Sequence, residues 1–503
     1  MTTTGTQQVL TAPLAVTLPA IPAGEALTQD QWGTLLALLD AIVPSIRCED
    51  SLPASLPEHA GNSTIYLSKD EYESKLTEIR RHAAPTAEPK AQNDLIEEFL
   101  ATKMSDNPLS KELLHSIISR LPPSKKKMLE MVLYLLGTMG GSLILTGYTT
   151  TVAQLPVTER AKVIHGWRTS SFYALRGLFK TITTLGKLVY LRTHDVLYHI
   201  TGFPHVPTDW VHTPDSFPYQ FLQPQPPSSK GGVVEIDTDV VIVGSGCGAG
   251  VTAWRLAKQF GPSLRVLVVE KGRHYDNSYY PMKNMYGLSN LFEAGGVIES
   301  DDGSITVTAG ATFGGGGTVN WSAALQTQHF VRKEWADRGL PFFESPAFQA
   351  CLDRVCDQMG VSGTVLTPNH GNKVLLEGAR KLGYDHKIVP QNTKRSAHDC
   401  GYCTLGCFKG EKQGPVNGWF PEAAKNGTKF MQGMKVDKVV FKTDKNGKKV
   451  AKGVKGTWTP VDGNGDGIKV KINAKKVIVS CGTLWSPIVL QNSGLKVSVF
   501  PYY

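Results

Sequence analysis

A glycine-rich turn, Gly-Ser-Gly-Cys-Gly-Ala-Gly, is the part of this sequence whose chemistry is clearest. It starts at Gly244, directly after the apolar residues 240–243, which predict a buried β-strand. Gly244 and Gly246 permit a tight turn, and a helix that follows would direct its free N–H groups at a diphosphate. The motif reads G-x-G-x-x-A, with Ala249 in the third position and Gly250 beside it. This arrangement predicts a dinucleotide-binding turn.

An acidic residue further along the chain supports this interpretation. Residues 266–269 predict a second buried strand, which ends at Glu270, twenty residues after Gly250. A carboxylate in that place accepts hydrogen bonds from the ribose hydroxyls of a dinucleotide. The alternative is a glycine-rich turn in another kind of α/β protein, but strand, turn, helix, strand and acid occur here in the expected order.

A second glycine cluster helps to choose between dinucleotides. Residues 311–321 read Ala-Thr-Phe-Gly-Gly-Gly-Gly-Thr-Val-Asn-Trp. Glycine lets the main chain come close to a flat, charged cofactor because it has no side chain. Two such clusters favour FAD over NAD.

These stretches resemble the glucose–methanol–choline (GMC) flavoprotein oxidoreductases and, more narrowly, the long-chain fatty alcohol oxidases. The later segments 481–487, Cys-Gly-Thr-Leu-Trp-Ser-Pro, and 492–495, Asn-Ser-Gly-Leu, belong to the same resemblance. Further matching segments lie at 27–45, 318–323, 334–336 and 400–407. The resemblance covers most of residues 27–496 and implies FAD as the cofactor.

The resemblance also implies which residues contact FAD. Gly244, Gly246, Gly250 and Glu270 would hold the ADP part, and Gly315, Gly316, Thr318 and Asn320 would lie against the flavin; the backbone of Val436 would contact adenine, and Cys481 and Gly482 would lie beside the diphosphate. Thr318 and Asn320 could instead cap a turn, and Val436 could simply be a core strand residue.

The implied reaction is the oxidation of a long-chain primary fatty alcohol to its aldehyde, with molecular oxygen reduced to hydrogen peroxide. In the family, Ser-Gly-Leu is followed by an Asn-Leu-x-x-His-Pro pattern and the catalytic histidine, whereas residues 497–503 here do not fit that pattern. We therefore predict a chain truncated at its C-terminus and assign no catalytic residue. The alternatives are a non-catalytic FAD-binding fragment and an FAD alcohol dehydrogenase with a quinone acceptor. Five histidines have a plainer interpretation as surface or loop residues: His274, His329, His370, His386 and His398.

A cysteine-rich run with a nearby histidine leaves three interpretations open. His398, Cys400, Cys403 and Cys407 give C-x2-C-x3-C, and these are ligand types for zinc or an iron–sulfur cluster. The run lacks a distant second pair, so we assign no metal. The other interpretations are a structural loop with buried or paired thiols and a redox site.

Composition limits the function classes. The 503 residues are 41% hydrophobic and 19% charged, as in a globular protein of several domains. The formal net charge of +9 comes without a basic–aromatic pattern, so nucleic-acid binding is not expected. Eight cysteines and no secretory signal favour a reducing compartment. The oligomeric state is left open.

The expected fold is α/β. A Rossmann-type FAD-binding domain is joined by an incomplete antiparallel substrate domain and an N-terminal helical extension. The expected organisation is a disordered lead (1–26), the helical extension (27–203), a Pro-rich linker or an extended clamp lying on a neighbouring part of the chain (204–232), the first part of the FAD-binding domain (233–328), a lid or substrate segment with the cysteine loop (329–427), and a truncated return of the FAD-binding domain (428–503).

One apolar segment bears on location. Residues 131–148 follow three lysines and contain no charge, and as one helix they would be about 27 Å long, just enough to span a bilayer. A spanning helix, a membrane-surface element and a buried hairpin all fit this composition. The expectation is a membrane-associated intracellular protein, endomembrane or peroxisomal.

Overall fold

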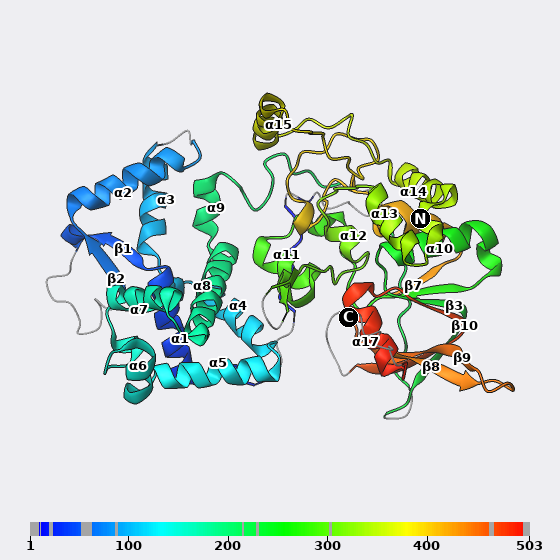
Figure 1. Cartoon of the computed structure of the whole chain (residues 1–503), viewed down its shortest axis with the longest axis horizontal. Coiled ribbons are helices and arrows are strands. Elements are labelled where there is room, and N and C mark those ends of the chain that lie inside the picture. Colours follow the sequence, from blue (N-terminus) through cyan, green and yellow to red (C-terminus); the bar gives the residue numbers. More distant parts are fainter. Residues whose placement is uncertain are drawn as a thin grey trace, which may run out of the picture. The chain divides into compact units, whose positions relative to one another are not determined.

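The computed structural model describes residues 10, 12–19, 24–51, 63–85, 89–213, 216–227, 231–300, 304–461 and 467–495. The chain divides into two compact units (Figure 1). One unit comprises residues 19–205, and the other comprises residues 1–18 with 206–503. The boundary near residue 205 agrees with the expected end of the helical extension.

The larger unit is built on a six-stranded sheet with the order β7-β4-β3-β10-β9-β8 (Figure 1). Four of its strands are parallel: β3 (Val234–Val243), β4 (Val266–Val269), β7 (Lys429–Met431) and β10 (Ile468–Val479). The antiparallel hairpin of β8 (Met434–Thr443) and β9 (Lys449–Trp458) extends the sheet beyond β10. The α/β prediction is confirmed.

Alternation along β3 explains the two cores that lie on the two faces of the main sheet. Val241 and Val243 pack with α17 (Gly482–Asn492) on one face, through Val489 of that helix. Val240 and Ile242 face α10 (Cys247–Phe260) and α16 (Phe420–Lys425) on the other. Successive side chains of a strand point to opposite faces of the sheet. Residues 240–243 of β3 are covered on both faces and are therefore all apolar.

The segment after residue 204 is part of this unit. Leu222 donates its N–H to the carbonyl of Phe430 at 2.8 Å, and the hydroxyl of Tyr219 donates to the Val416 carbonyl at 2.5 Å. In the predicted lead, Leu14 donates its N–H to the Ser278 carbonyl at 2.7 Å. The described parts of both segments are therefore extended chain that contacts the larger unit, which fits the second interpretation of residues 204–232, an extended clamp lying on a neighbouring part of the chain. Residues 1–9, 11 and 20–23 of the predicted lead lie outside the described residues.

Residues 329–427 are mainly helix and loop. The helices are α13 (His329–Asp337), α14 (Pro346–Met359) and α15 (His370–Leu382), followed by long loops and a π-helical turn, Pro415–Trp419. The remaining elements of this unit are α11 (Asn284–Leu291), α12 (Gly316–Val319) and the short antiparallel pair β5 (Ile298–Glu299) and β6 (Thr306–Val307). In the part of the chain that the structure describes, the larger antiparallel pairings, β8–β9 and β9–β10, both belong to the main sheet, so a separate antiparallel substrate sheet is not observed there.

The smaller unit is helical, as predicted. Its elements are α1 (Gln29–Ile42), β1 (Ser45–Cys48), β2 (Thr64–Leu67), α2 (Lys69–His82), α3 (Pro89–Ala101), α4 (Pro108–Ser119), α5 (Pro123–Leu136), α6 (Met139–Thr146), α7 (Val157–Thr169), α8 (Tyr173–Thr193) and α9 (Asp195–Thr201). The helix α1 starts with a capping box, because Thr28 and Gln31 exchange hydrogen bonds with each other's backbone N–H. Thr28-x-x-Gln31 is the sequence pattern that such a cap requires.

A buried arginine ties several helices of the smaller unit together. The guanidinium of Arg160 donates to the Leu155 carbonyl at 3.0 Å and to the Ser63 hydroxyl at 3.1 Å, and it also reaches the Ala37 carbonyl. Its side chain is fully enclosed, with Asp40 nearby as an opposite charge. Burial lowers the pKa of Arg160.

The apolar segment 131–148 is not one helix. It is divided between α5 and α6, whose axes differ by 100°. A methyl group at Gly141 would lie 2.3 Å from the Leu135 carbonyl oxygen, so the sharp bend requires glycine. Among the described residues no single helix is long and apolar enough to cross a membrane, and this bent pair alone passes the same test when its two helices are taken together.

Candidate functional site

The parallel strands bring three turns to one edge of the sheet. Val243, Val269 and Val479 are in register on neighbouring strands, so their carboxyl ends coincide. The turn after β3 packs closely on the turn after β10: a methyl group at Gly244 would lie 2.3 Å from the Ser480 carbonyl oxygen, and its φ is +95°. Only glycine meets both conditions.

Ser245 is the polar centre of this edge. Its hydroxyl donates to Glu270 Oε2 at 2.7 Å, and its N–H donates to the same oxygen at 2.9 Å. The hydroxyl also accepts the N–H of Gly314 at 2.8 Å, so it links both glycine clusters. Ser245 is fully buried. Sequence reasoning passed over it because the motif leaves the position between the two glycines unspecified.

Glu270 lies where the sequence predicts it. Besides the two bonds from Ser245, its Oε1 accepts the N–H of Gly272 at 2.8 Å. A carboxylate has about four acceptor positions, so three protein donors leave room for a ribose hydroxyl. The backbone carbonyl of Glu270 accepts the N–H of Met434 at 2.8 Å, which places the start of β8 beside it. Val436 follows two residues later, with its side chain 8% exposed within the core.

The second glycine cluster lies directly on the first. Gly315 has φ +54°, and a methyl group there would lie 3.1 Å from the α-carbon of Gly246. Thr318 and Asn320 make turn-capping bonds. The Thr318 hydroxyl donates to the Phe313 carbonyl at 2.8 Å, and the Asn320 amide both donates to the Gly317 carbonyl and accepts the N–H of Ser322. In this structure the side chains of Thr318 and Asn320 therefore both cap turns, as the alternative interpretation expects.

The third turn contains Cys481 and Gly482. The Cys481 thiol donates to the Val243 carbonyl at 3.4 Å, and its N–H donates to the Ser486 hydroxyl at 3.1 Å. Burial raises the pKa of this thiol to about 11, so it is a neutral thiol near pH 7. Gly482 has φ +73° and opens α17.

Gly250 differs from the other predicted glycines. A methyl group there would lie 2.8 Å from the Trp419 ring and 3.1 Å from Pro415. Its α-carbon therefore faces the π-helical turn, and its small size serves helix packing. This placement does not support the predicted cofactor contact.

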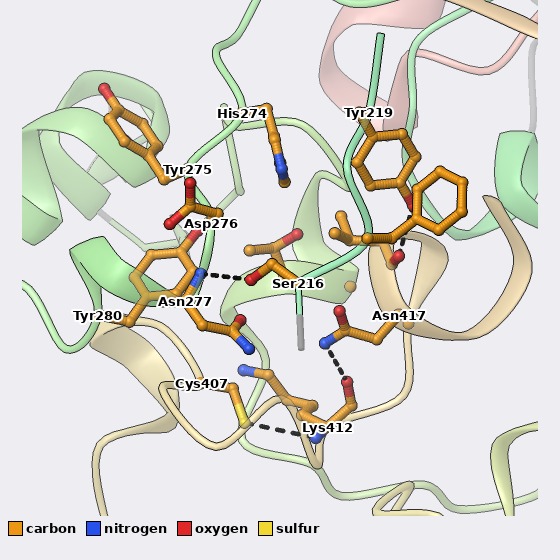
Figure 2. A pocket seen from close by; sticks show the side chains of 15 residues that line it. Ser216, Tyr219, His274, Tyr275, Asp276, Asn277, Tyr280, Cys407, Lys412 and Asn417 are labelled. Carbon is orange, nitrogen blue, oxygen red and sulfur yellow. Dashed lines mark hydrogen bonds between the residues drawn. The ribbon is translucent and has the colours of Figure 1, made fainter. Parts of the chain in front are cut away.

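A pocket adjoins the second glycine cluster (Figure 2). It has an empty volume of about 460 Å³ and shares Gly317 and Thr318 with that cluster. The described segment after residue 215 forms one wall, where the Ser216 hydroxyl accepts the N–H of Asn277 at 2.9 Å. Lys412 also lines the pocket; it is buried, and its ammonium donates to the carbonyls of Asn320 at 2.8 Å and Cys403 at 2.9 Å.

The histidines are dispersed. His274 lines the pocket within a group of aromatic rings, and burial lowers its pKa to about 4. Exposed positions hold His329, His370 and His386. The His398 side chain is 5% exposed and contacts Cys403, so its loop location was predicted but its burial was not. Among the described residues no group of three or more His, Cys, Asp or Glu side chains is arranged to hold a metal ion.

Comparisons with known proteins agree with this geometry. The GMC oxidoreductase family profile matches residues 288–499. A long-chain-alcohol oxidase of Arabidopsis thaliana, FAO4A, is 29% identical over 422 residues, which are 72% of this chain and 57% of that protein. A second, FAO3, is 38% identical over 42% of this chain and 28% of its own length.

This chain is similar to members of the GMC oxidoreductase family over residues 288–499. It spans 57% of the length of FAO4A and 28% of that of FAO3. Cholesterol oxidase of Mycobacterium tuberculosis is less similar, 25% identical over 39% of this chain and 38% of the relative. Solved structures that align with it include an FAD-dependent oxidoreductase from Chaetomium thermophilum, with a TM-score of 0.35, 18% identity and coverage of 51% of this chain and 47% of that one.

FAD is the cofactor of GMC oxidoreductases, and the residues at this edge fit it. Methyl groups built at Gly246, Gly316 and Gly482 would meet no described atom within 4 Å, so the main chain is open at these three points. The N-terminus of α10, a helix of 14 residues, begins at Cys247 between them. Open glycine backbone and free helical N–H groups suit a diphosphate, and the remaining acceptor position of Glu270 suits a ribose.

Proposed function

We propose that this protein takes part in the FAD-dependent oxidation of long-chain primary fatty alcohols to aldehydes, with oxygen reduced to hydrogen peroxide. The observation that supports the cofactor is that Ser245 joins both glycine clusters to Glu270, while the turn after β10 packs on Gly244 at the same sheet edge. The substrate class rests on the similarity to long-chain-alcohol oxidases. Because the chain spans 57% of FAO4A, the activity is proposed for the protein to which these residues belong.

Different residues would hold different parts of the cofactor. The open backbone at Gly246 and the N-terminus of α10 would bind the diphosphate, and Glu270 would orient the ribose. Open backbone at Gly316 would let the chain approach the flavin end. Bound FAD supplies the hydride acceptor. Lys412 fixes the backbone of Asn320 and Cys403 beside that end, and we assign no catalytic base to this chain.

The test begins with the purified chain loaded with FAD. We expect a flavin absorbance band that remains after gel filtration. A C16 primary alcohol added without oxygen should bleach the band, and readmitted air should restore it with release of peroxide. A flavin band that persists with alcohol, in protein of normal secondary structure, would overturn catalysis by this chain and favour the non-catalytic FAD-binding fragment.

The same experiment separates an oxidase from a dehydrogenase. Bleaching by alcohol followed by slow reoxidation in air, with fast turnover on an added quinone, would favour the dehydrogenase that uses a quinone acceptor. Peroxide formed in equal amount to aldehyde would favour the oxidase. Gly246→Ala, whose new methyl group would enter the open face, is the matched variant that should lose the flavin band in either case.

We further propose that the protein associates with an intracellular membrane, endomembrane or peroxisomal, through α5 and α6. Large apolar side chains on these two helices are exposed: Met128, Met131, Tyr134, Met139, Leu143 and Ile144. Three lysines, 125–127, precede them in α5, and they complement an anionic lipid surface. A substrate that partitions into membranes fits this location.

Flotation with lipid vesicles tests the membrane proposal. We expect the protein to float with vesicles of phosphatidylcholine and phosphatidylserine, and less with phosphatidylcholine alone. Met131→Asp combined with Ile144→Asp should abolish flotation, whereas Leu382→Asp, at an equally exposed apolar position on α15, should not. Equal flotation of the double variant and the wild type would overturn this role of α5 and α6.

A further inference from the structure

The cysteine loop contains a buried Cys–His–Glu chain of hydrogen bonds. The ring nitrogen Nε2 of His398 lies 2.9 Å from Cys403 Sγ, and its Nδ1 lies 2.9 Å from Glu411 Oε2. The His398 side chain is only 5% exposed. Both ring nitrogens therefore face acceptors, which is the environment that holds an imidazolium.

The charges within this group are distributed unequally. Hydrogen bonds to Cys403 and to Glu411 raise the pKa of His398 to about 9 despite its burial. A hydrogen bond from Cys400, another from His398 and the charge of Lys412 lower the pKa of Cys403 to about 3. The same contact with Cys403, together with burial, raises the pKa of Cys400. Near pH 7 this arrangement is a thiolate at Cys403 and a thiol at Cys400.

The thiolate lies beside the chain that leaves the second glycine cluster. The Ser322 hydroxyl is 3.4 Å from Cys403 Sγ. Next to it, the Trp321 indole donates to the Thr404 hydroxyl at 2.8 Å. Lys412 bridges the Asn320 and Cys403 carbonyls. Oxidation of Cys403 would therefore alter the contacts of residues 320–322, the segment that follows the second glycine cluster.

We propose that Cys403 is a peroxide-reactive thiolate and that Cys400 is its resolving cysteine. Two cysteines at C-x2-C spacing, one bonded to a histidine–glutamate pair, form the usual environment of a reactive dithiol. Cys403 is partly exposed, so a small oxidant can reach it, whereas Cys407 is buried and burial raises its pKa.

The reaction balances in two steps. The Cys403 sulfur attacks one oxygen of hydrogen peroxide, the O–O bond breaks, and the departing hydroxide takes the proton of His398 to become water. The thiol of Cys400 then attacks the resulting sulfenic sulfur, the S–S bond forms, and a second water leaves. In total, two thiols are oxidised and one peroxide is reduced. Peroxide made by the protein itself rests on the proposed oxidase function, whereas reactivity toward added peroxide does not.

The test uses the full chain in its reduced form and without alcohol. Its result therefore does not depend on the outcome of the oxidase assay. Hydrogen peroxide is added with a sulfenic-acid trap, and the cysteines are mapped by mass spectrometry. The wild type should form a Cys400–Cys403 disulfide, and Cys400→Ser should retain a trapped sulfenic acid at Cys403. A disulfide between other cysteines, or no trapped Cys403, would overturn the proposal.

The pH profile separates a reactive thiolate from an accessible thiol. Cys351 on α14 is exposed and serves as the control within the same protein. Between pH 8 and pH 6 the alkylation of an ordinary thiol slows by about 10-fold or more as its thiolate is lost. Cys403 should slow by less than about 2-fold over this range because it stays ionised. A Cys403 profile parallel to that of Cys351 would contradict the proposal.

His398 is a positioning residue in this scheme, and its variant has its own readout. His398→Asn should make the alkylation of Cys403 slow more with decreasing pH than in the wild type, because one of the groups that stabilise the thiolate is gone. A purely structural role would leave the pH profile unchanged. If the variant does not fold, the wild-type profile and the Cys400→Ser trapping still decide the question.

Discussion

The Ser245 hydroxyl donates to Glu270 Oε2 at 2.7 Å while accepting the N–H of Gly314. One buried oxygen thus joins the two glycine clusters to the acid at the end of β4. A hydrogen-bonded group that is fully buried has no solvent to replace a lost partner. The geometry of the candidate site should therefore depend strongly on this residue.

Ser245→Ala tests that dependence. The substitution leaves the buried Gly314 N–H unsatisfied, so we expect a loss of about 1–3 kcal/mol in the free energy of unfolding. Binding of FAD should weaken in parallel, because Glu270 loses a partner that holds it. Urea unfolding and flavin titration measure the two effects. Ser263→Ala, at an exposed position, is the control, and equal losses in both variants would contradict the central role of Ser245.

Gly246→Ala should separate folding from cofactor binding. A methyl group there meets no described atom within 4 Å, so the free energy of unfolding of the apoprotein should change by less than about 1 kcal/mol. The same methyl group would occupy the space proposed for the diphosphate, and FAD affinity should fall by at least about 10-fold, or 1.4 kcal/mol. Apoprotein unfolding and FAD titration are measured side by side. Unchanged FAD affinity would place the cofactor elsewhere.

Gly315→Ala is the contrasting change. Its φ of +54° and its contact with the Gly246 α-carbon mean that alanine strains the apoprotein itself. The expected cost is about 1–2 kcal/mol from the left-handed backbone alone. Gly447→Ala, also at positive φ but in an open turn, measures that backbone cost without the contact. Gly315→Ala should lower the urea midpoint of unfolding by more than Gly447→Ala does.

His274 should make stability depend on pH. Burial lowers its folded-state pKa to about 4, below the ordinary 6.5, so the unfolded chain binds a proton first as pH falls. Its stabilising contribution is present above pH 6.5 and is lost as pH falls toward 4, by at most roughly 3 kcal/mol. Urea unfolding of wild type and His274→Phe between pH 7 and pH 4 measures this loss. The variant should show a smaller decrease, while the exposed His370→Phe should behave as the wild type does.

Arg160→Leu tests the smaller unit. The change deprives the Leu155 carbonyl and the Ser63 hydroxyl of their donor and removes one of the two cations near Asp40, which keeps its ion pair with Lys103. Removing one member of a buried charged group costs about 3–5 kcal/mol, so the thermal midpoint of this unit should fall clearly. Arg168→Leu, on an exposed position of the same helix, should have little effect. Similar midpoints for both variants would contradict the structural importance of Arg160.

Several features could be predicted from local sequence alone. The apolar strands, the turn at Gly244 and the acid at Glu270 recur in the structure as expected, and the Thr-x-x-Gln spacing at Thr28 matches the capping box observed there. These features depend on the period of apolar residues, on backbone angles that only glycine adopts easily, and on side chains three residues apart. Each of these is encoded within a short stretch of chain.

Other features required the folded chain. The contact of Gly315 with Gly246, the hydrogen bonds of Ser245, and the bond from His398 to Cys403 join residues whose chemistry is unremarkable when each is read alone. The sequence determined that a dinucleotide turn exists and which acid accompanies it. The tertiary structure decided which loops meet at that edge and which thiol is ionised, because both depend on the pairing of distant strand ends and on burial, which no short segment specifies.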